Sequence, residues 1–107
     1  MNLVDPEQQS LLVLIAPARR RDDIVDALMG NGAISGFSVG HSAGFSREHG
    51  HLDRRERVQG HGDFARFEIL CSAGARRSLL DDLAAVAGRD ALRYWVLPLI
   101  DAGTIGG

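Results

Sequence analysis

The chain has 107 residues, the size of a single domain, which excludes a multidomain enzyme. Its hydrophobic fraction of 45% and charged fraction of 24% are typical of globular proteins and exclude a disordered or fibrous chain. The formal net charge is -2, and all 12 basic residues are arginine, so nucleic acid is not an expected partner.

The apolar content also bears on location. No apolar run reaches the roughly 20 residues that cross a bilayer, and residues 11–16 are too short and poorly placed for a signal peptide. The single cysteine, Cys71, cannot form an intramolecular disulfide, which fits a reducing compartment and a role as core filler. We therefore expect a cytoplasmic protein.

Hydropathy predicts a strand and then a helix at the start of the chain. Residues 11–16 are apolar at every position, as in a strand whose two faces are both buried. In residues 19–31 apolar side chains recur at i and i+4, as Ile24 and Leu28 do, which is the period of an amphipathic helix. Its expected end is the Gly-Asn-Gly of residues 30–32.

A second strand and a long polar segment follow. Residues 36–41 alternate small and larger side chains, which predicts a strand whose glycines let a backbone or a ligand approach closely. Residues 42–62 have no hydrophobic period and are rich in glycine and histidine. So long a loop in a small domain is more often functional or disordered than connective, and it is where we look for function.

The second half of the chain repeats the alternation of strand and helix. Residues 64–71 alternate in hydropathy and predict a third strand. Residues 75–87 have helical spacing, with Gly88 as the expected stop, and residues 92–99 predict a last strand. The tail, residues 101–107, is rich in glycine.

This order of elements predicts an α+β fold, the ferredoxin-like βαββαβ sandwich, with both helices on one face of an antiparallel sheet. We expect one domain over residues 1–107, with its core at 11–102, the loop at 42–62 and a flexible tail at 103–107. Phe64, Leu70 and either Tyr94 or Trp95 must then point away from the helices, so a monomer would expose a sizeable apolar surface. Self-association in a closed ring would bury it, although the number of subunits is left open.

Three segments resemble a known family. Residues 36–51, GFSVGHSAGFSREHGH, resemble without a gap the strand-to-loop segment of the PII nitrogen-regulatory signalling proteins, which reads G-x-T-V and then G-F-G-R-Q-x-G-H. Residues 94–102, YWVLPLIDA, resemble the last core strand of that family, I-F-V-L-P-V-E-D-A. Residues 22–28 are similar to its first helix, and the resemblance covers nearly all of residues 11–102.

The resemblance implies a homotrimer that binds an adenine nucleotide (ATP, ADP or AMP), with magnesium as a further ligand, between subunits. It also implies a second small effector, bicarbonate or 2-oxoglutarate, and a long T-loop that regulates a partner, commonly a membrane transporter. By position, Ser38 matches the hydroxyl that contacts adenine, Arg47 a phosphate-side arginine, Arg93 the lysine at the phosphates, and Glu48 a glutamine that helps to hold magnesium and 2-oxoglutarate. The implied nucleotide-binding set is Gly36, Phe37, Ser38, Gly44, Ser46, Arg47, Glu48, Gly88, Arg89 and Arg93.

Several departures place the chain in a PII-like branch outside nitrogen signalling, related to the divalent-cation-tolerance proteins. The phosphate loop G-D-G-K of the family is R-D-A-L-R at residues 89–93, so guanidiniums would replace an amide nest. The family's paired arginines after Asp101-Ala102 are absent, and the only tyrosine is Tyr94. Relatives in this wider group are associated with heavy-metal efflux, bicarbonate uptake and carboxysomes, or divalent-cation tolerance, and the sequence does not choose among them.

Other functions remain as alternatives. His41, His49 and His51 supply imidazoles suited to zinc, copper or nickel, so the alternative function is a divalent heavy-metal-binding protein linked to metal tolerance or efflux. The competing interpretation of these histidines is a solvated loop. A nucleophilic triad around Ser42 or Ser46 would require an arbitrarily chosen aspartate, so we do not expect an enzyme. A third possibility is an interaction module without a small-molecule ligand.

Overall fold

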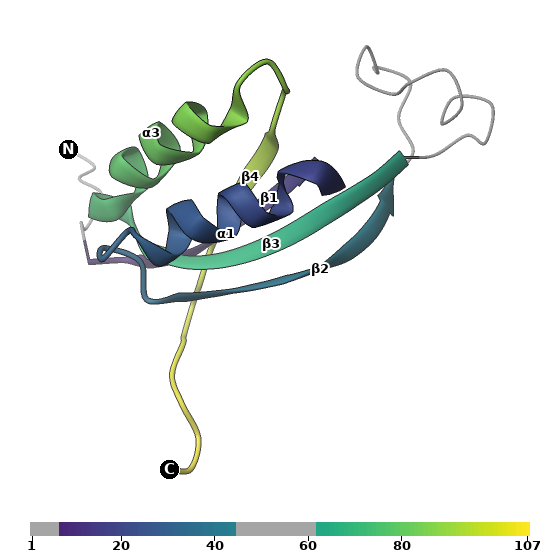
Figure 1. The fold of residues 1–107 in the computed structure, drawn as a ribbon. Coiled ribbons are helices and arrows are strands. Elements are labelled where there is room, and N and C mark those ends of the chain that lie inside the picture. The colour runs from purple at the N-terminus through teal and green to yellow at the C-terminus, as the bar shows by residue number, and fades with distance from the viewer. Residues whose placement is uncertain (1–6, 45–61) are drawn as a thin grey trace.

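The computed structural model describes residues 7–44 and 62–107. Its elements follow the expected order of strands and helices (Figure 1). They are β1 (Gln9–Pro17), α1 (Arg21–Met29), β2 (Gly36–Gly44), β3 (Gly62–Ser72), α3 (Arg76–Ala87) and β4 (Arg93–Pro98), with short 3-10 turns η1 (Ala18–Arg20) and η2 (Ala73–Ala75) before the helices. None of the helices in these ranges is long and apolar enough to cross a membrane.

The strands form an antiparallel sheet in the order β2-β3-β1-β4, and α1 and α3 lie against one of its faces (Figure 1). This is the predicted α+β ferredoxin-like fold. The alternating residues of β3 that face the helices are Ala65, Phe67, Ile69 and Cys71, and all of them are buried. Cys71 is a free thiol in this core, as predicted.

The central strand β1 is buried on its helix side, and on its other side Val13 is buried while Leu11 and Ile15 are half-buried, so the prediction of two buried faces is confirmed only in part. Leu12 and Leu14 belong to the core under the helices. Val13 lies on the opposite face of the sheet and is nevertheless 0% exposed. A neighbour therefore covers this second face at Val13, and that cover forms part of the site described below.

The boundaries of the predicted loop, 42–62, were wrong by three residues at its start and by one at its end. Strand β2 continues to Gly44 and β3 begins at Gly62, because Ser42, Ala43 and Gly44 pair in register with Phe64, Asp63 and Gly62. Cross-strand pairing extends the strands beyond the apolar alternation that marks them in the sequence. The first helix begins at Arg21, two residues later than expected, because residues 18–20 form the turn η1.

Candidate functional site

The sheet face opposite the helices, called here the open face, carries both apolar and charged side chains. Val13 is paired in register with Glu68 on one side and Trp95 on the other, so these side chains share the open face. The guanidinium carbon of Arg66 lies 5.9 Å from the centroid of the Trp95 ring, and its Nη2 lies 3.6 Å from Oε2 of Glu68. Glu68 and Trp95 are therefore the cross-strand neighbours of the buried Val13, and Arg66 contacts both of them.

Part of the open face remains apolar and exposed, as predicted. Of Tyr94 and Trp95, Trp95 points away from the helices, because it pairs with Val13 while Tyr94 pairs with the core residue Leu14. Trp95 is 40% exposed and Leu97 is 47% exposed. A face of this composition is typical of a surface that contacts another molecule.

A pocket of about 380 Å³ opens where β2 crosses the open face. It is lined by Leu11, Gly36, Phe37, Ser38, Glu68 and Leu70. Gly36 pairs with Leu70 and Ser38 pairs with Glu68, so the wall combines an apolar side chain, a hydroxyl and a carboxylate. No heavy atom lies within 4 Å of the position that a Cβ on Gly36 would occupy, which leaves this edge of the pocket open. A flat, partly apolar ligand with hydrogen-bonding groups fits such a wall.

Arg93 lies on the same face but away from this pocket. It pairs with Ile15, and Ile15 pairs with Arg66, which is next to Gly40 of β2. Three strand spacings and two residues along the strand therefore separate Ser38 from Arg93, about 15 Å by sheet geometry. The pocket at Ser38 and the guanidinium of Arg93 do not meet within one chain.

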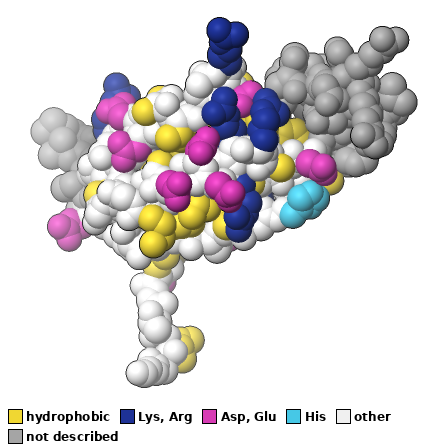
Figure 2. All heavy atoms as spheres, viewed as in Figure 1, with side chains coloured by type: hydrophobic (Ala, Val, Ile, Leu, Met, Phe, Trp, Pro, Cys, Tyr) yellow, Lys and Arg dark blue, Asp and Glu magenta, His cyan; other side chains and the backbone are white. Residues whose placement is uncertain are grey.

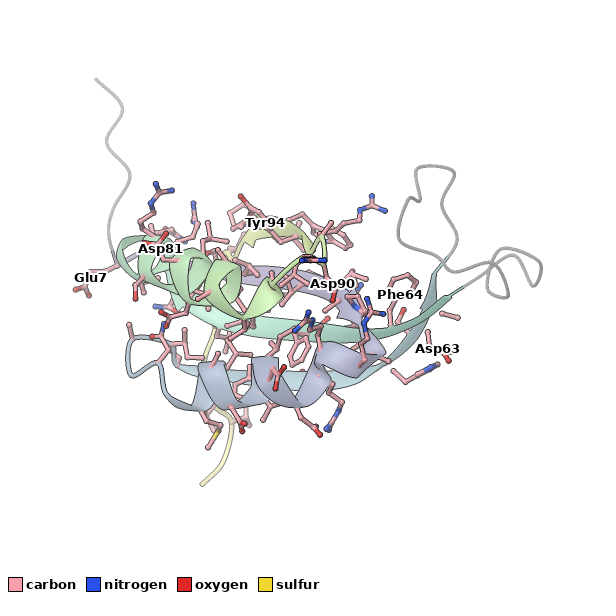
Figure 3. The ribbon with its side chains drawn as sticks, turned by 45° about the horizontal axis from the view of Figure 1, so that its top comes forward. Glu7, Asp63, Phe64, Asp81, Asp90 and Tyr94 are labelled. Carbon is pink, nitrogen blue, oxygen red and sulfur yellow. The ribbon has the colours of Figure 1, made fainter. Side chains whose placement is uncertain are left out.

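The segment after α3, which contains Gly88 and Arg89, is fixed by Asp90. Arg20 Nε donates to Asp90 Oδ2 at 2.6 Å, and Arg19 Nη2 donates to Asp90 Oδ1. The Asp90 side chain is 12% exposed and lies between the end of α3 and the start of α1 (Figure 3). The hydrogen bond from Arg20, helped by the charge of Arg19, holds the pKa of Asp90 below its usual value in spite of burial. We call the contact of Arg19 and Arg20 with Asp90 the Asp90 clamp. Arg89, the residue before Asp90, is exposed.

Replacing Asp90 by asparagine is expected to lower the melting temperature at pH 7, because both arginines lose their charged partner. A carboxylate whose folded pKa is depressed stabilises the fold above its unfolded pKa of about 4, and this stabilisation is lost as pH falls through the lower folded pKa. The difference in melting temperature between wild type and D90N should therefore be constant from about pH 5 to 7 and shrink below about pH 4. If the difference in melting temperature between wild type and D90N is unchanged at pH 2.5, the carboxylate of Asp90 does not stabilise the fold through Arg19 and Arg20.

The other predicted site residues divide into two groups. Gly44 lies under Phe64, since a Cβ on Gly44 would approach the Phe64 ring to 2.8 Å, so its close neighbour is a side chain of the same chain. His41 Nε2 lies 3.3 Å from Asp63 Oδ1, and no group of three or more metal-ligating side chains occurs within residues 7–44 and 62–107. The remaining predicted ligands, Ser46, Arg47, Glu48, His49 and His51, lie outside the described residues.

Sequence reasoning missed residues that the fold brings to the site. Leu11, Glu68 and Leu70 line the pocket at Ser38 from β1 and β3. Arg19 and Arg20 hold Asp90 from about 70 positions earlier in the chain. The alternation of β3 already placed Glu68 and Leu70 on one face of that strand. Assigning them to the pocket at Ser38 required the register between β3 and β2.

The chain is similar to a known protein family and to solved structures. Residues 7–106 match the family described as "Protein of unknown function (DUF3240)". The chain belongs to this family. The crystal structure of a DUF3240 family protein from Shewanella baltica OS155 is 39% identical, covers 92% of this chain and 98% of its own, and superposes with a TM-score of 0.79. No curated protein matches the chain.

More distant structures share the fold. CutA1 from the psychrotrophic bacterium Shewanella sp. SIB1 is 14% identical, with a TM-score of 0.71 over 92% of this chain and 87% of its own. PII from Arabidopsis thaliana, bound to citrate, is 18% identical, with a TM-score of 0.65 over 87% of this chain and 78% of its own. A Bacillus cereus protein related to NIF3 reaches 0.68 at 17% identity, but the match spans only 29% of that longer chain. The chain therefore has the fold of the PII and CutA1 proteins.

Proposed function

We propose that this chain is a cytoplasmic, non-catalytic signalling protein that forms a homotrimer and binds an adenine nucleotide between copies of itself. Nucleotide binding shifts the population of conformations of residues 42–62, and this segment regulates a partner, a membrane transporter for bicarbonate or metal. A ligand can do so only if it favours one conformation over the other. The proposal uses the PII resemblance of the sequence together with the shared fold.

The observation that carries the proposal is the division of the predicted site within one chain. Gly36, Phe37 and Ser38 line one open-face pocket, whereas Arg93 lies on the same face but does not meet it. A ligand with an apolar, hydrogen-bonding end and a phosphate end would be recognised completely only where a second copy brings its own Arg93 towards the pocket. Binding between copies accounts for the distance between the pocket at Ser38 and Arg93 within one chain. It also accounts for the exposed apolar side chains of the open face.

The relatives support an anionic small ligand. The Arabidopsis PII structure contains citrate, a small molecule with several carboxylates. Arginine binds carboxylates and phosphates through two parallel, charge-assisted hydrogen bonds, and every basic residue of this chain is arginine. We propose nucleotide with magnesium as the first ligand and bicarbonate or 2-oxoglutarate as the second effector.

Calorimetric titration with ATP, ADP and AMP, each with and without magnesium and with bicarbonate or 2-oxoglutarate added, tests the proposal. We expect saturable binding near one nucleotide per chain for at least one of the three. The absence of heat and of competition with a fluorescent adenine nucleotide would overturn the nucleotide proposal and leave the fold assignment intact.

Arg93→Ala is expected to weaken nucleotide binding at least tenfold, because a phosphate loses a charge-assisted contact. Arg21→Ala, which removes an exposed arginine from the helix layer, is the matched control and should bind like wild type. Ser38→Phe should also abolish binding by filling the pocket. Mixing Ser38→Phe chains with Arg93→Ala chains, followed by dissociation and reassembly, should restore a fraction of the sites if they lie between copies. A mixture that stays inactive while it forms mixed assemblies would contradict an intersubunit site.

A further inference from the structure

The C-terminal segment, residues 99–107, is hydrogen-bonded to the start of the chain at Leu99, and its later residues, 100–107, leave the domain and are exposed. Figure 1 shows it extending from the end of β4 on the side of the sheet away from the helices. Ile100 is 105% exposed and Ile105 is 102% exposed, and in Figure 2 the hydrophobic side chains of this extension stand clear of the body. Two fully solvated isoleucines on an extended chain are typical of a segment that is buried by something else.

The edge of the sheet formed by β4 is the second unpartnered feature. The strand order leaves β4 paired only with β1, so its outer backbone edge is free within the described residues. Tyr94, Trp95 and Leu97 are 50%, 40% and 47% exposed along this edge. A flat, apolar edge with no proline in its interior is a template for the addition of another strand.

Apolar surface also continues to either side of this edge. On the helix side, α3 and β4 enclose a pocket of about 360 Å³ whose apolar walls include Leu80, Leu83, Ala87, Leu92 and Tyr94. Tyr94 and Asp81, which line this pocket, are labelled in Figure 3. On the open face lie Trp95 and Leu97. An occupant of the β4 edge would need apolar side chains on both of its faces.

We propose that residues 99–107 of one copy add to the β4 edge of a second copy, so that neighbouring chains are held together by exchanged tails. Side chains alternate along an extended strand, so positions 100 and 105 fall on opposite faces of it. One isoleucine would then enter the pocket between α3 and β4, and the other would cover Trp95 and Leu97. The glycines at 103, 106 and 107 carry no side chain to obstruct close approach of the two backbones.

A second copy, not the same chain, is the occupant that the geometry favours. Leu99 N donates to Gln9 O at 3.2 Å, and Gln8 Nε2 donates to Leu99 O at 2.9 Å, so the start of the tail is fixed in line with β4 and directed away from it. Nine extended residues reach at most about 30 Å, which is enough to cross to a neighbouring domain. The inference requires association of copies but no nucleotide, so it is independent of the ligand in the proposed function.

Sedimentation equilibrium of the full chain over a range of concentrations tests this exchange. The double variant Ile100→Ser, Ile105→Ser should dissociate at a concentration at least tenfold higher than wild type, and Leu97→Lys, which charges the β4 edge, should do the same. Met29→Ser is the matched control, because Met29 is a 74% exposed apolar residue on α1, and it should associate like wild type. Circular dichroism must show that each variant is folded.

Hydrogen exchange separates exchange between copies from folding back. In wild type, the protection of the β4 amides that point away from β1 should fall on dilution through the dissociation concentration, and in the tail variant it should be low throughout. An unchanged dissociation concentration in the Ile100→Ser, Ile105→Ser variant would overturn the proposal. So would protection of these outward-pointing β4 amides that persists in the monomer, since the tail would then pair within its own chain.

Discussion

Phe67→Ala is expected to lower the free energy of unfolding by about 3–5 kcal/mol. Phe67 is 0% exposed at the centre of β3, where Leu14 of β1 and Val39 of β2 are its direct cross-strand neighbours. Its ring centroid lies 6.5 Å from that of Phe37, so truncation removes contacts within the sheet and beneath the helices. A small domain has only about 5–15 kcal/mol of stability in total, so the variant loses a large share of it.

Urea unfolding at a fixed protein concentration measures this loss, because association of copies would otherwise alter the apparent stability. Ile69→Val, at another fully buried position of β3, should cost only about 0.5–1.5 kcal/mol. Met29→Ala, at an exposed position, should stay within about 0.5 kcal/mol of wild type. A loss of less than 1 kcal/mol for Phe67→Ala would show that Phe67 does not occupy the core as described.

The elements that the sequence predicted best are those whose pattern reports burial. In β3, Phe67, Ile69 and Cys71 alternate with Arg66, Glu68 and Leu70, and the first set is buried because only that face of the strand meets the helices. The start of β2 at Gly36 was predicted correctly, and its C-terminal end was predicted poorly. Ser42 and Gly44 carry no hydrophobic signal, and they belong to the strand only because β3 offers them hydrogen-bonding partners.

The site was predictable where its residues are consecutive and not where the fold assembles it. Gly36 and Ser38 were identified from one continuous segment and do line a pocket. Glu68 and Leu70 line the same pocket, but they are about 30 residues away, and the pairing that places them depends on strand register. Asp90 shows the same limit, because its partners Arg19 and Arg20 could be identified only once the ends of the two helices were known to meet.

The structure gives Gly88, one of the predicted nucleotide-binding residues, a structural role. Gly88 was expected to end a helix and, through the resemblance, to contact a nucleotide. It does end α3, with φ 60° and ψ -121°, a conformation that residues other than glycine rarely adopt. A Cβ at this position would also approach Arg20 Nη2 to 2.9 Å. The positive φ therefore favours glycine at residue 88, and an added methyl would also have to displace the end of the Arg20 side chain, whether or not a nucleotide binds nearby.

Gly88→Ala is accordingly expected to destabilise the protein by about 1–3 kcal/mol, the usual range for a residue held in a sparsely populated backbone conformation. Gly32→Ala is the control, because no atom lies within 4 Å of its added Cβ and its φ is not positive, and it should change stability by about 0.5 kcal/mol or less. Chemical denaturation of both variants measures the difference. Equal stability of the Gly88 and Gly32 variants would contradict the strain at residue 88.

A double-mutant cycle between Gly88→Ala and Asp90→Asn then separates strain from the loss of the clamp. If the added methyl acts by displacing Arg20 from Asp90, the two changes share one interaction, and the double variant should lose less stability than the two single losses combined. If backbone strain alone acts, the losses should add. Nucleotide titration of Gly88→Ala and Asp90→Asn tests the role of residue 88 in binding. A loss of affinity in both variants would show that residue 88 positions the 89–93 segment. A loss confined to Gly88→Ala would show that residue 88 contacts the ligand directly.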